Sequence, residues 1–245
     1  MSPKNSIIGF DFLQRISNPQ INLILAFQFS MIHNLSKTNS IFNQFTSELR
    51  NIHVQKDRMR FRRNLERMGE ILAYEISKTL EYETNEITTP LGIANIPLIA
   101  TQPVLITILR AGLPLHIGLL NYFDMAENAF VSAYRKHHKD GSFEVEIEYL
   151  SSPDLTDKVV ILNDPILATG TSLVLAYKAL LTNGIPKHVH IVCCIASVQG
   201  VEYVKRNLPH NTTIWCGAID DELTAQSYIV PGLGDAGDLA FGTKL

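Results

Sequence analysis

Residues 159–172 read VVILNDPILATGTS, and the rest of the chain is best interpreted outward from them. An apolar run with the length of a buried strand ends at Asp164, and a helical pattern begins within a few residues of Gly170. Glycine permits a turn that other residues rarely adopt. Successive N–H groups at the start of a helix form a cavity that suits a phosphate dianion, to which nearby Thr and Ser hydroxyls add donors. The stretch therefore predicts a buried strand, an anion-binding turn and a helix.

A purely structural interpretation of the same turn stays open, because Thr and Ser are also common caps of helices. The turn is not a Walker loop, since no G-x-x-x-x-G-K-[ST] pattern occurs in the chain. Asp164 directly follows the strand, where its carboxylate is placed to accept hydrogen bonds from sugar hydroxyls. A sugar phosphate is thus the ligand class that this stretch favours.

Apolar strands and helices alternate around this stretch. The predicted strands are 103–109, 129–134, 158–162, 189–195 and 213–219, and the predicted helices are 57–80, 113–122, 173–182 and 198–207. This order indicates an α/β fold with a central, mostly parallel sheet flanked by helices. Right-handed crossovers then bring the carboxyl ends of the strands to one edge, where ligands of such sheets bind.

Two further segments predict antiparallel strands. Residues 143–149 (FEVEIEY) alternate strictly between apolar and charged, as a half-exposed strand does, and a charged turn with Asp140-Gly141 at its tip precedes them. Residues 83–89 and 93–99 read as the two strands of a hairpin. The tail, 228–245, is so rich in glycine that we expect no regular element in it.

The composition bounds the class of protein. The chain has 245 residues, 46% of them hydrophobic and 18% charged, as in an ordinary globular protein. The net charge of −3 argues against a nucleic-acid binder or a protein of anionic membranes, so an anionic ligand would need a local positive site. Cys193, Cys194 and Cys216 lie in apolar runs without zinc spacing, which indicates buried free thiols in a reducing compartment.

The N-terminal 40 residues carry no domain-like pattern. We interpret 1–40 as a poorly ordered or additional extension and 41–245 as a single domain, with translation starting at Met31 as an alternative. The apolar run at 21–29 is similar to a signal-peptide core, but Asn22 and Gln28 interrupt it and no A-x-A site follows. We therefore expect a cytoplasmic protein without a membrane-spanning segment.

Two other segments carry site-like residues. In ILRAGLP, 108–114, Arg110 follows a buried strand, where it is costly unless it faces an anion or a carboxylate; a surface arginine is the alternative. Arg135 opens the charged turn after the strand at 129–134. Five arginines on the predicted helix at 57–80 are interpreted as a solvated face, with a phosphate site or subunit interface as the alternative. They are Arg58, Arg60, Arg62, Arg63 and Arg67.

These motifs together resemble one family. The stretch DPILATGTS is similar to the PRPP-binding signature of type I phosphoribosyltransferases, and its Asp-Pro in place of two adjacent acids resembles the uracil phosphoribosyltransferases. Tyr134-Arg135 and the tail YIVPGLGDAGDLAFGT, 228–243, resemble the same enzymes. The resemblance runs from about Phe45 to Leu245. It implies the type I phosphoribosyltransferase fold, with a hairpin arm and a C-terminal hood that binds the base.

The resemblance also implies the reaction and its residues. Uracil and PRPP would give UMP and pyrophosphate, with Mg²⁺ carried largely by PRPP and no dedicated metal ligands. The implied PRPP-binding residues are Arg110, Arg135, Asp164, Pro165, Ile166, Leu167, Ala168, Thr169, Gly170, Thr171, Ser172 and Asp235. The implied uracil-binding residues are Tyr228, Ile229, Gly234, Asp235 and Ala236. Those expected to act in catalysis are Asp164, Arg110, Arg135 and Asp235.

The physical logic of the tail is base recognition by the backbone. Uracil offers two carbonyl acceptors and two N–H donors, and a glycine-rich loop can bring main-chain groups to all of them. Many relatives carry Arg where this chain has Leu239, which removes an ion pair with Asp238. The family further implies a homodimer or higher homo-oligomer and a GTP effector, without nucleic-acid or membrane partners.

Other functions stay open at this point. A phosphoribosyltransferase of a purine or of orotate would share the PRPP motifs, although the tail speaks against it. A nucleotide-sensing regulator that binds RNA would need a basic face, for which the charge offers little support. A scaffold without catalysis fits least, because three ligand-type loops are expected at one sheet edge.

Overall fold

The centre of the molecule is the predicted mixed sheet. The computed structural model describes residues 32–137 and 143–243. The strand order of the sheet is β1-β10-β9-β7-β4-β5-β6, and β8 pairs with β9. All its pairs are parallel except β5 with β6. The strands are β1 (Ile32–Asn34), β4 (Val104–Leu109), β5 (Asn128–His137), β6 (Phe143–Ser151), β7 (Val159–Asn163), β8 (Ile166–Leu167), β9 (His188–Ser197) and β10 (Thr212–Asp220). The predicted α/β class is thereby confirmed.

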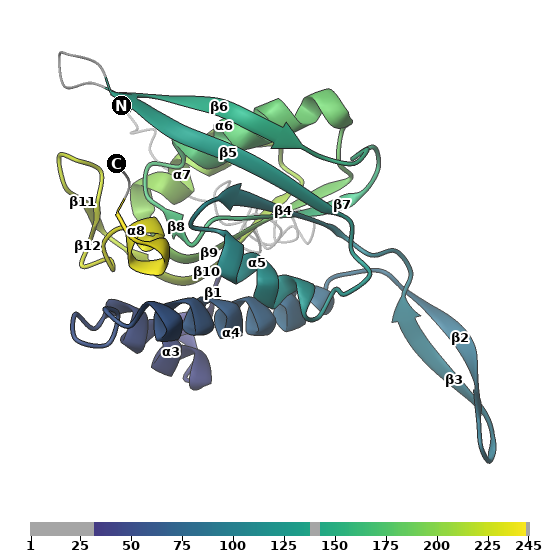
Figure 1. Ribbon diagram of the computed structural model, residues 1–245. Coiled ribbons are helices and arrows are strands. Elements are labelled where there is room, and N and C mark those ends of the chain that lie inside the picture. Colours follow the sequence, from purple (N-terminus) through teal and green to yellow (C-terminus); the bar gives the residue numbers. More distant parts are fainter. Residues whose placement is uncertain (1–31, 138–142, 244–245) are drawn as a thin grey trace, which may run out of the picture.

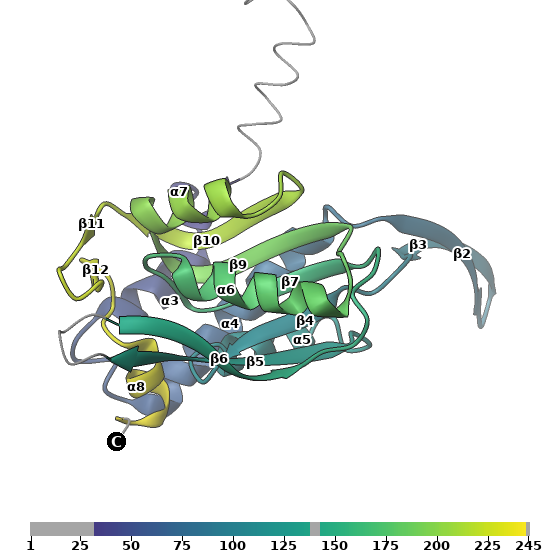
Figure 2. The same ribbon diagram turned by 90° about the horizontal axis from the view of Figure 1, so that it is seen from above.

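Helices cover both faces of this sheet (Figures 1 and 2). The helices on one face are α3 (Ile41–Arg50), α4 (Arg58–Ser77) and α5 (Leu113–Leu120); those on the other are α6 (Thr171–Leu180) and α7 (Val198–Asn207). Successive strand residues point to opposite faces. Leu105 and Ile161 accordingly join the core under α4, whereas Ile106 and Leu162 join the core under α6. Short 3₁₀ turns, η1 (Leu35–Lys37) and η2 (Leu181–Asn183), follow β1 and α6.

The long helix α4 forms as its sequence predicts. Asp57 caps it, with its side chain accepting a hydrogen bond from the N–H of Arg60 at 3.1 Å. Its backbone touches that of α5: a Cβ on Gly69 would lie 2.4 Å from the carbonyl oxygen of Leu115, and one on Gly118 would lie 2.0 Å from that of Glu66. Only glycines permit this approach, so the two helices are locked together.

A two-stranded hairpin stands away from the rest of the molecule. It consists of β2 (Tyr82–Thr89) and β3 (Gly92–Ile99), as predicted, and forms a sheet of its own. Figure 1 shows it projecting far beyond the central sheet. The hairpin carries large exposed apolar side chains. They are Tyr82, Ile87, Leu91, Ile93, Ile96 and Leu98.

The tail departs from its prediction. Instead of lacking regular structure, it contains the short helix α8 (Ala236–Phe241) and the strand β12 (Ile229–Val230), which pairs with β11 (Glu222–Leu223) just before the tail. The helix begins because the Asp235 side chain accepts a hydrogen bond from the N–H of Asp238 at 2.9 Å. Ala236 and Ala240 are buried in the core beside α4. Counting glycines therefore missed a cap followed by an apolar helical face.

Smaller differences concern where elements begin and end. The sheet starts before residue 40, because β1 pairs with residues 214–216 of β10, so an edge strand lies in the segment that we interpreted as an extension. The strand predicted at 129–134 continues to His137, and the turn tip at Asp140-Gly141 falls outside the described residues. α6 begins at Thr171, two residues before its predicted start.

Buried polar and thiol groups occur within this core. Burial raises the pKa of the Cys193, Cys194 and Cys216 thiols, and all three cysteines are free, as interpreted from the sequence. In the part of the chain that the structure describes, no helix is long and apolar enough to cross a membrane.

A row of aromatic rings lies across β1, β10 and β9. His33 stacks on Trp215 at 3.9 Å between ring centroids, and the Trp215 Nε1–H donates to His190 Nδ1 at 3.0 Å. His188 lies 4.5 Å from His190. Burial, with the neighbouring His188 and His33, lowers the pKa of His190 to about 3, so its ring is neutral in the folded protein.

This histidine makes folding stability depend on pH. Because the folded pKa lies below the ordinary value of 6.5, the unfolded chain takes up the proton first as pH falls. Stability is then fully present above pH 6.5 and falls by about 1.4 kcal/mol per pH unit below it from this residue alone. Urea unfolding between pH 7.5 and 5 measures the slope. His190→Gln, which still accepts from Trp215, should flatten it; an unchanged slope would contradict this origin.

Candidate active site

The expected site residues lie at the carboxyl edge of the sheet. Arg110 follows β4 and Asp164 follows β7, and these two strands are hydrogen-bonded neighbours. The tail follows β10, which pairs with β9, the other neighbour of β7. Figure 1 shows β11, β12 and α8 folded over this edge. Loops distant in sequence therefore converge as the strand order predicts.

The anion-binding turn has an open helix start. Gly170 is the N-cap of α6 with φ +80°, and as a glycine it brings no side-chain cap. The Thr169 Oγ1 accepts from the N–H of Thr171 at 3.4 Å and donates to the Thr171 Oγ1 at 3.1 Å. The first amides of α6 are thus placed as an anion site requires.

The first turn of α7 supports this loop from behind. Ser197, the N-cap of α7, donates its hydroxyl to the carbonyl of Ala168 at 2.5 Å and accepts from the N–H of Gly200 at 2.8 Å. A Cβ on Gly200 would lie 2.3 Å from the Ala168 carbonyl oxygen. The loop backbone is consequently fixed by close contact with a second helix.

Residues 164–167 are held by β9. The Asp164 N–H donates to the Val192 carbonyl at 3.1 Å, and the Asp164 Oδ1 accepts from the Ile166 N–H at 3.3 Å. The Pro165 carbonyl accepts from two β9 amides, and the Leu167 side chain is buried. Leu167 can therefore meet a ligand only through its backbone, and Asp164 is half-buried at the mouth of the loop.

A buried polar chain lies beneath the two loops. The Thr107 hydroxyl donates to Asn163 Oδ1 at 3.1 Å, and the Asn163 Nδ2 lies 3.4 Å from His116 Nδ1. The His116 Nε2 meets Asn128 Oδ1 at 2.7 Å. Burial lowers the pKa of His116. A Cβ on Gly112 would lie 2.2 Å from the Thr107 hydroxyl oxygen, so glycine is required where the Arg110 loop crosses this chain.

Arg110 joins the first loop to the tail. Its Nη2 donates to the Gly242 carbonyl at 3.2 Å and lies 3.4 Å from Asp238 Oδ1. The side chain is 41% exposed, as in the alternative of a surface arginine, and its guanidinium faces a carboxylate, which is one of the two partners expected from the sequence. Asp238 therefore has a cationic partner despite the Leu at 239. Ala111, next to Arg110, packs against the same hydrophobic core as Ala236 of the tail.

The tail itself is well packed. Ile229 and Ala236 are buried, whereas the Tyr228 side chain is 47% exposed. Gly232 and Gly234 have φ +52° and +95°, which only glycine adopts at little cost. Asp235 caps α8. Main-chain groups around Gly234 are therefore displayed on a turn whose flanking side chains are anchored in the core.

Arg135 lies on β5, where its backbone pairs with Val145 of β6, near the antiparallel end of the sheet. Of the charged turn that follows, residues 138–142 lie outside the described part.

The arginines of α4 are engaged more than their solvated interpretation predicts. Arg62 donates to the Ala240 carbonyl at 2.7 Å and lies over the Phe241 ring. Arg60 pairs with Glu48 of α3, and Arg63 with Glu66. Arg62 therefore connects α4 to the tail, and Arg60 connects α4 to α3.

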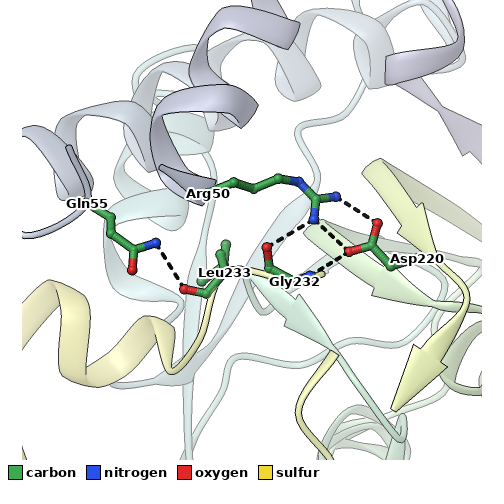
Figure 3. A network of polar contacts seen from close by, with 5 residues as sticks. All are labelled: Arg50, Gln55, Asp220, Gly232 and Leu233. Atoms are coloured by element: carbon green, nitrogen blue, oxygen red, sulfur yellow. Dashed lines mark hydrogen bonds and ion pairs between the residues drawn. The ribbon is translucent and has the colours of Figure 1, made fainter. Parts of the chain in front are cut away.

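Sequence reasoning missed one group altogether (Figure 3). Arg50, the last residue of α3, binds Asp220, the last residue of β10, and the tail backbone at Gly232. The available signal was the one used for Arg110, a charged residue directly after a buried apolar strand. Asp220 has this position, but no partner could be named without the fold.

Comparison with known proteins gives consistent matches. A family model described as "Uracil phosphoribosyltransferase" matches residues 36–243. A uracil phosphoribosyltransferase of Porphyromonas gingivalis is 58% identical over 215 residues, covering 88% of this chain and 99% of the relative. One of Methanococcus maripaludis is 41% identical over 201 residues, covering 80% and 84%. The solved structure of the AQ2163 protein from Aquifex aeolicus superimposes with a TM-score of 0.77 at 28% identity, covering 88% of this chain and all of that one.

Proposed function

The chain belongs to the uracil phosphoribosyltransferase family, a group of pentosyltransferases with the type I phosphoribosyltransferase fold, and we propose that it converts uracil and PRPP to UMP and pyrophosphate at the edge just described. The observation that carries this site assignment is the bond of Arg110 to the tail. Through it, a loop suited to pyrophosphate and a loop suited to a base share one side chain.

In this proposal the turn at 168–172 binds the 5′-phosphate of PRPP. The uncapped start of α6 and the Thr169 and Thr171 hydroxyls supply the donors. Asp164 accepts hydrogen bonds from the ribose hydroxyls. Arg110 and Arg135 receive the pyrophosphate, because a planar guanidinium binds phosphate oxygens through two parallel hydrogen bonds.

The tail supplies the base site. Main-chain groups of Ile229 and of the run Gly234-Asp235-Ala236 pair with the uracil edge, and Tyr228 borders it. Cytosine carries an amine where uracil has O4, so a donor would face a donor, and such mismatches discriminate by orders of magnitude. The positive φ and the exposure of Gly234 support this role, since its main chain lies at the surface on a turn that other residues rarely adopt.

Mg²⁺ fits the site only as a companion of PRPP. Within residues 32–137 and 143–243, no group of three or more His, Cys, Asp or Glu side chains is arranged to hold a metal. Asp164 and Asp235 each offer a carboxylate, and Mg²⁺ is commonly bound by one or two carboxylates together with substrate phosphates and water. The ion would neutralise charge on the pyrophosphate.

The chain's own contribution to the reaction is positioning and charge stabilisation. Uracil N1 forms the bond to the anomeric carbon as the bond to pyrophosphate breaks, and Arg110 and Arg135 stabilise the departing charge. Holding both substrates in line accounts for most of the rate enhancement in such reactions. Asp235 is the candidate to accept the N1 proton, and polarisation of uracil by the loop is the alternative to a general base.

The test is direct. Purified full-length protein is incubated with PRPP, Mg²⁺ and uracil, and UMP is measured by chromatography. We expect UMP from uracil and no nucleotide from hypoxanthine, orotate or cytosine. Product from a purine or orotate instead would overturn the base assignment, and a salt-dependent RNA shift without turnover would favour a regulator.

Adding GTP to the same assay tests the proposed effector, and fractionation of cells tests the proposed cytoplasmic location.

We also propose a homodimer in which the β2–β3 hairpin of each copy covers the other. An isolated two-stranded hairpin is marginally stable in water. This one exposes Leu91 fully and Ile93 by 68%, on an arm that stands clear of its own domain. A second copy would bury this apolar surface, which supports the oligomer that the family resemblance implies.

The double substitution Leu91→Asp with Ile93→Asp should convert the dimer to a monomer, because each charge would be buried without a partner. Light scattering should give 27.4 kDa for the variant and about twice that value for the wild type. Ile185→Asp, at a side chain outside the hairpin that is 72% exposed, is the matched control and should remain dimeric. A wild-type mass of one chain would rule out the dimer.

A further inference from the structure

The backbone of the base loop is tied to α3 by a small buried network (Figure 3). The guanidinium of Arg50 binds Asp220 through two hydrogen bonds, Nη1 to Oδ2 at 2.7 Å and Nη2 to Oδ1 at 2.8 Å. The same Nη1 donates to the Gly232 carbonyl at 3.0 Å, and Asp220 Oδ2 accepts from the Gly232 N–H at 3.0 Å. The N–H and the carbonyl of Gly232 are therefore both held by the Arg50–Asp220 ion pair.

A second side chain fixes the next residue. The Gln55 amide, in the turn after α3, donates to the Leu49 carbonyl at 2.7 Å and to the Leu233 carbonyl at 3.1 Å. The Leu233 side chain is itself buried in the core. Gly232 and Leu233 lie between Ile229 and Gly234, so the constraint acts on the segment that joins the two sets of proposed uracil contacts.

The position of the network indicates its use. Asp220 is 9% exposed, and a buried ion pair adds little net stability compared with apolar packing, while it does fix geometry. Gly232 has φ +52°, and a Cβ there would lie 2.1 Å from the Ile229 carbonyl oxygen. Gly232 therefore adopts a conformation that only glycine fits, and its bonds to Arg50 and Asp220 determine how its peptide groups are oriented.

We propose that Arg50 and Asp220, assisted by Gln55, are positioning residues that set the uracil-binding peptides of the tail. This inference rests on the proposed function, because it assigns the loop after Gly232 to the base. The network contacts neither the turn at 168–172 nor Arg110 in any bond described above. It therefore acts on uracil binding more strongly than on PRPP binding, which it reaches only through tail residues such as Asp235.

Steady-state kinetics of Arg50→Ala in the full-length enzyme tests this separation. We expect the KM for uracil to rise about tenfold or more, as expected for the loss of a charge-assisted hydrogen bond that orients a binding loop. The KM for PRPP should rise less than the KM for uracil, because the turn at 168–172 is held by α7. Arg50→Lys keeps the charge but loses the forked geometry, and should give an intermediate uracil KM.

Arg60→Ala is the matched control. Arg60 makes the same kind of forked bond, through Nε and Nη2 to Glu48 at 2.8 Å each, and also joins α3 to its surroundings without touching the tail. Its loss should leave both KM values unchanged. Thermal unfolding of both variants separates loss of fold from loss of positioning.

If Arg50→Ala does not fold, Gln55→Ala and Arg50→Lys carry the test, and each should raise the uracil KM selectively. An unchanged uracil KM in folded variants, or an equal rise for uracil and PRPP, would overturn the inference while leaving the proposed function intact. Absence of UMP formation by the wild type would instead overturn both.

Discussion

Asp164→Asn is expected to lower kcat about 100-fold, the cost typical of misplacing reacting groups, while the protein remains folded. The amide keeps the size of the carboxylate and the acceptor for the Ile166 N–H, so the loop at 164–167 stays in place. What is lost is a negative acceptor at the mouth of the site, where the ribose hydroxyls and the Mg²⁺ of PRPP are proposed to lie. Single-turnover formation of UMP measures the effect.

The selectivity of this effect is as informative as its size. Asp164 is proposed to face the ribose rather than the base, so the KM for uracil should change little. Asp154→Asn is a matched control, since Asp154 also holds a turn, through bonds to Thr156, away from the proposed site. Wild-type turnover in Asp164→Asn would remove this residue from the proposed active site.

Arg110→Ala is expected to lower kcat/KM for PRPP about 100-fold or more, the usual cost of removing one group that stabilises charge developing in the transition state. Unlike Asp164, Arg110 also bonds to Asp238 and Gly242. Its loss should therefore raise the KM for uracil as well. A combined defect in both substrates distinguishes this variant from Asp164→Asn and from Arg50→Ala.

Arg110→Lys tests the geometry of the guanidinium. A lysine keeps the charge but cannot make two parallel bonds to phosphate, so we expect only partial recovery of kcat/KM. Full recovery would show that charge alone is needed. An Arg110→Ala enzyme with normal PRPP kinetics would contradict the proposed pyrophosphate contact.

Much of the fold followed from local signals. The strands 103–109, 158–162 and 189–195 were predictable because buried parallel strands are continuous apolar runs between helices. Their shared edge followed from crossover handedness, which is why Arg110 and Asp164 could be assigned to one site before any contact was known. The strict alternation of 143–149 likewise identified an antiparallel strand.

The parts that were wrong or missed depend on contacts distant in sequence. The helix α8 forms because Asp235 caps it and α4 offers a surface for Ala236 and Ala240, neither of which is visible in a count of glycines. The strand β1 is three residues long and exists only by pairing with β10. The role of Arg50 could not be predicted, because its partner Asp220 lies 170 residues later in the chain.

The glycine contact between α4 and α5 affects the position of the Arg110 loop relative to the tail. α5 starts directly after the Arg110 loop, and α4 also grips the tail through Arg62 and the Ala240 carbonyl. The helix α4 therefore sets the distance between the proposed pyrophosphate site and the proposed base site. Alanine at Gly69 or Gly118 would push α4 and α5 apart. The Arg110 loop and the tail would then both shift, so the binding of PRPP and of uracil would be affected together.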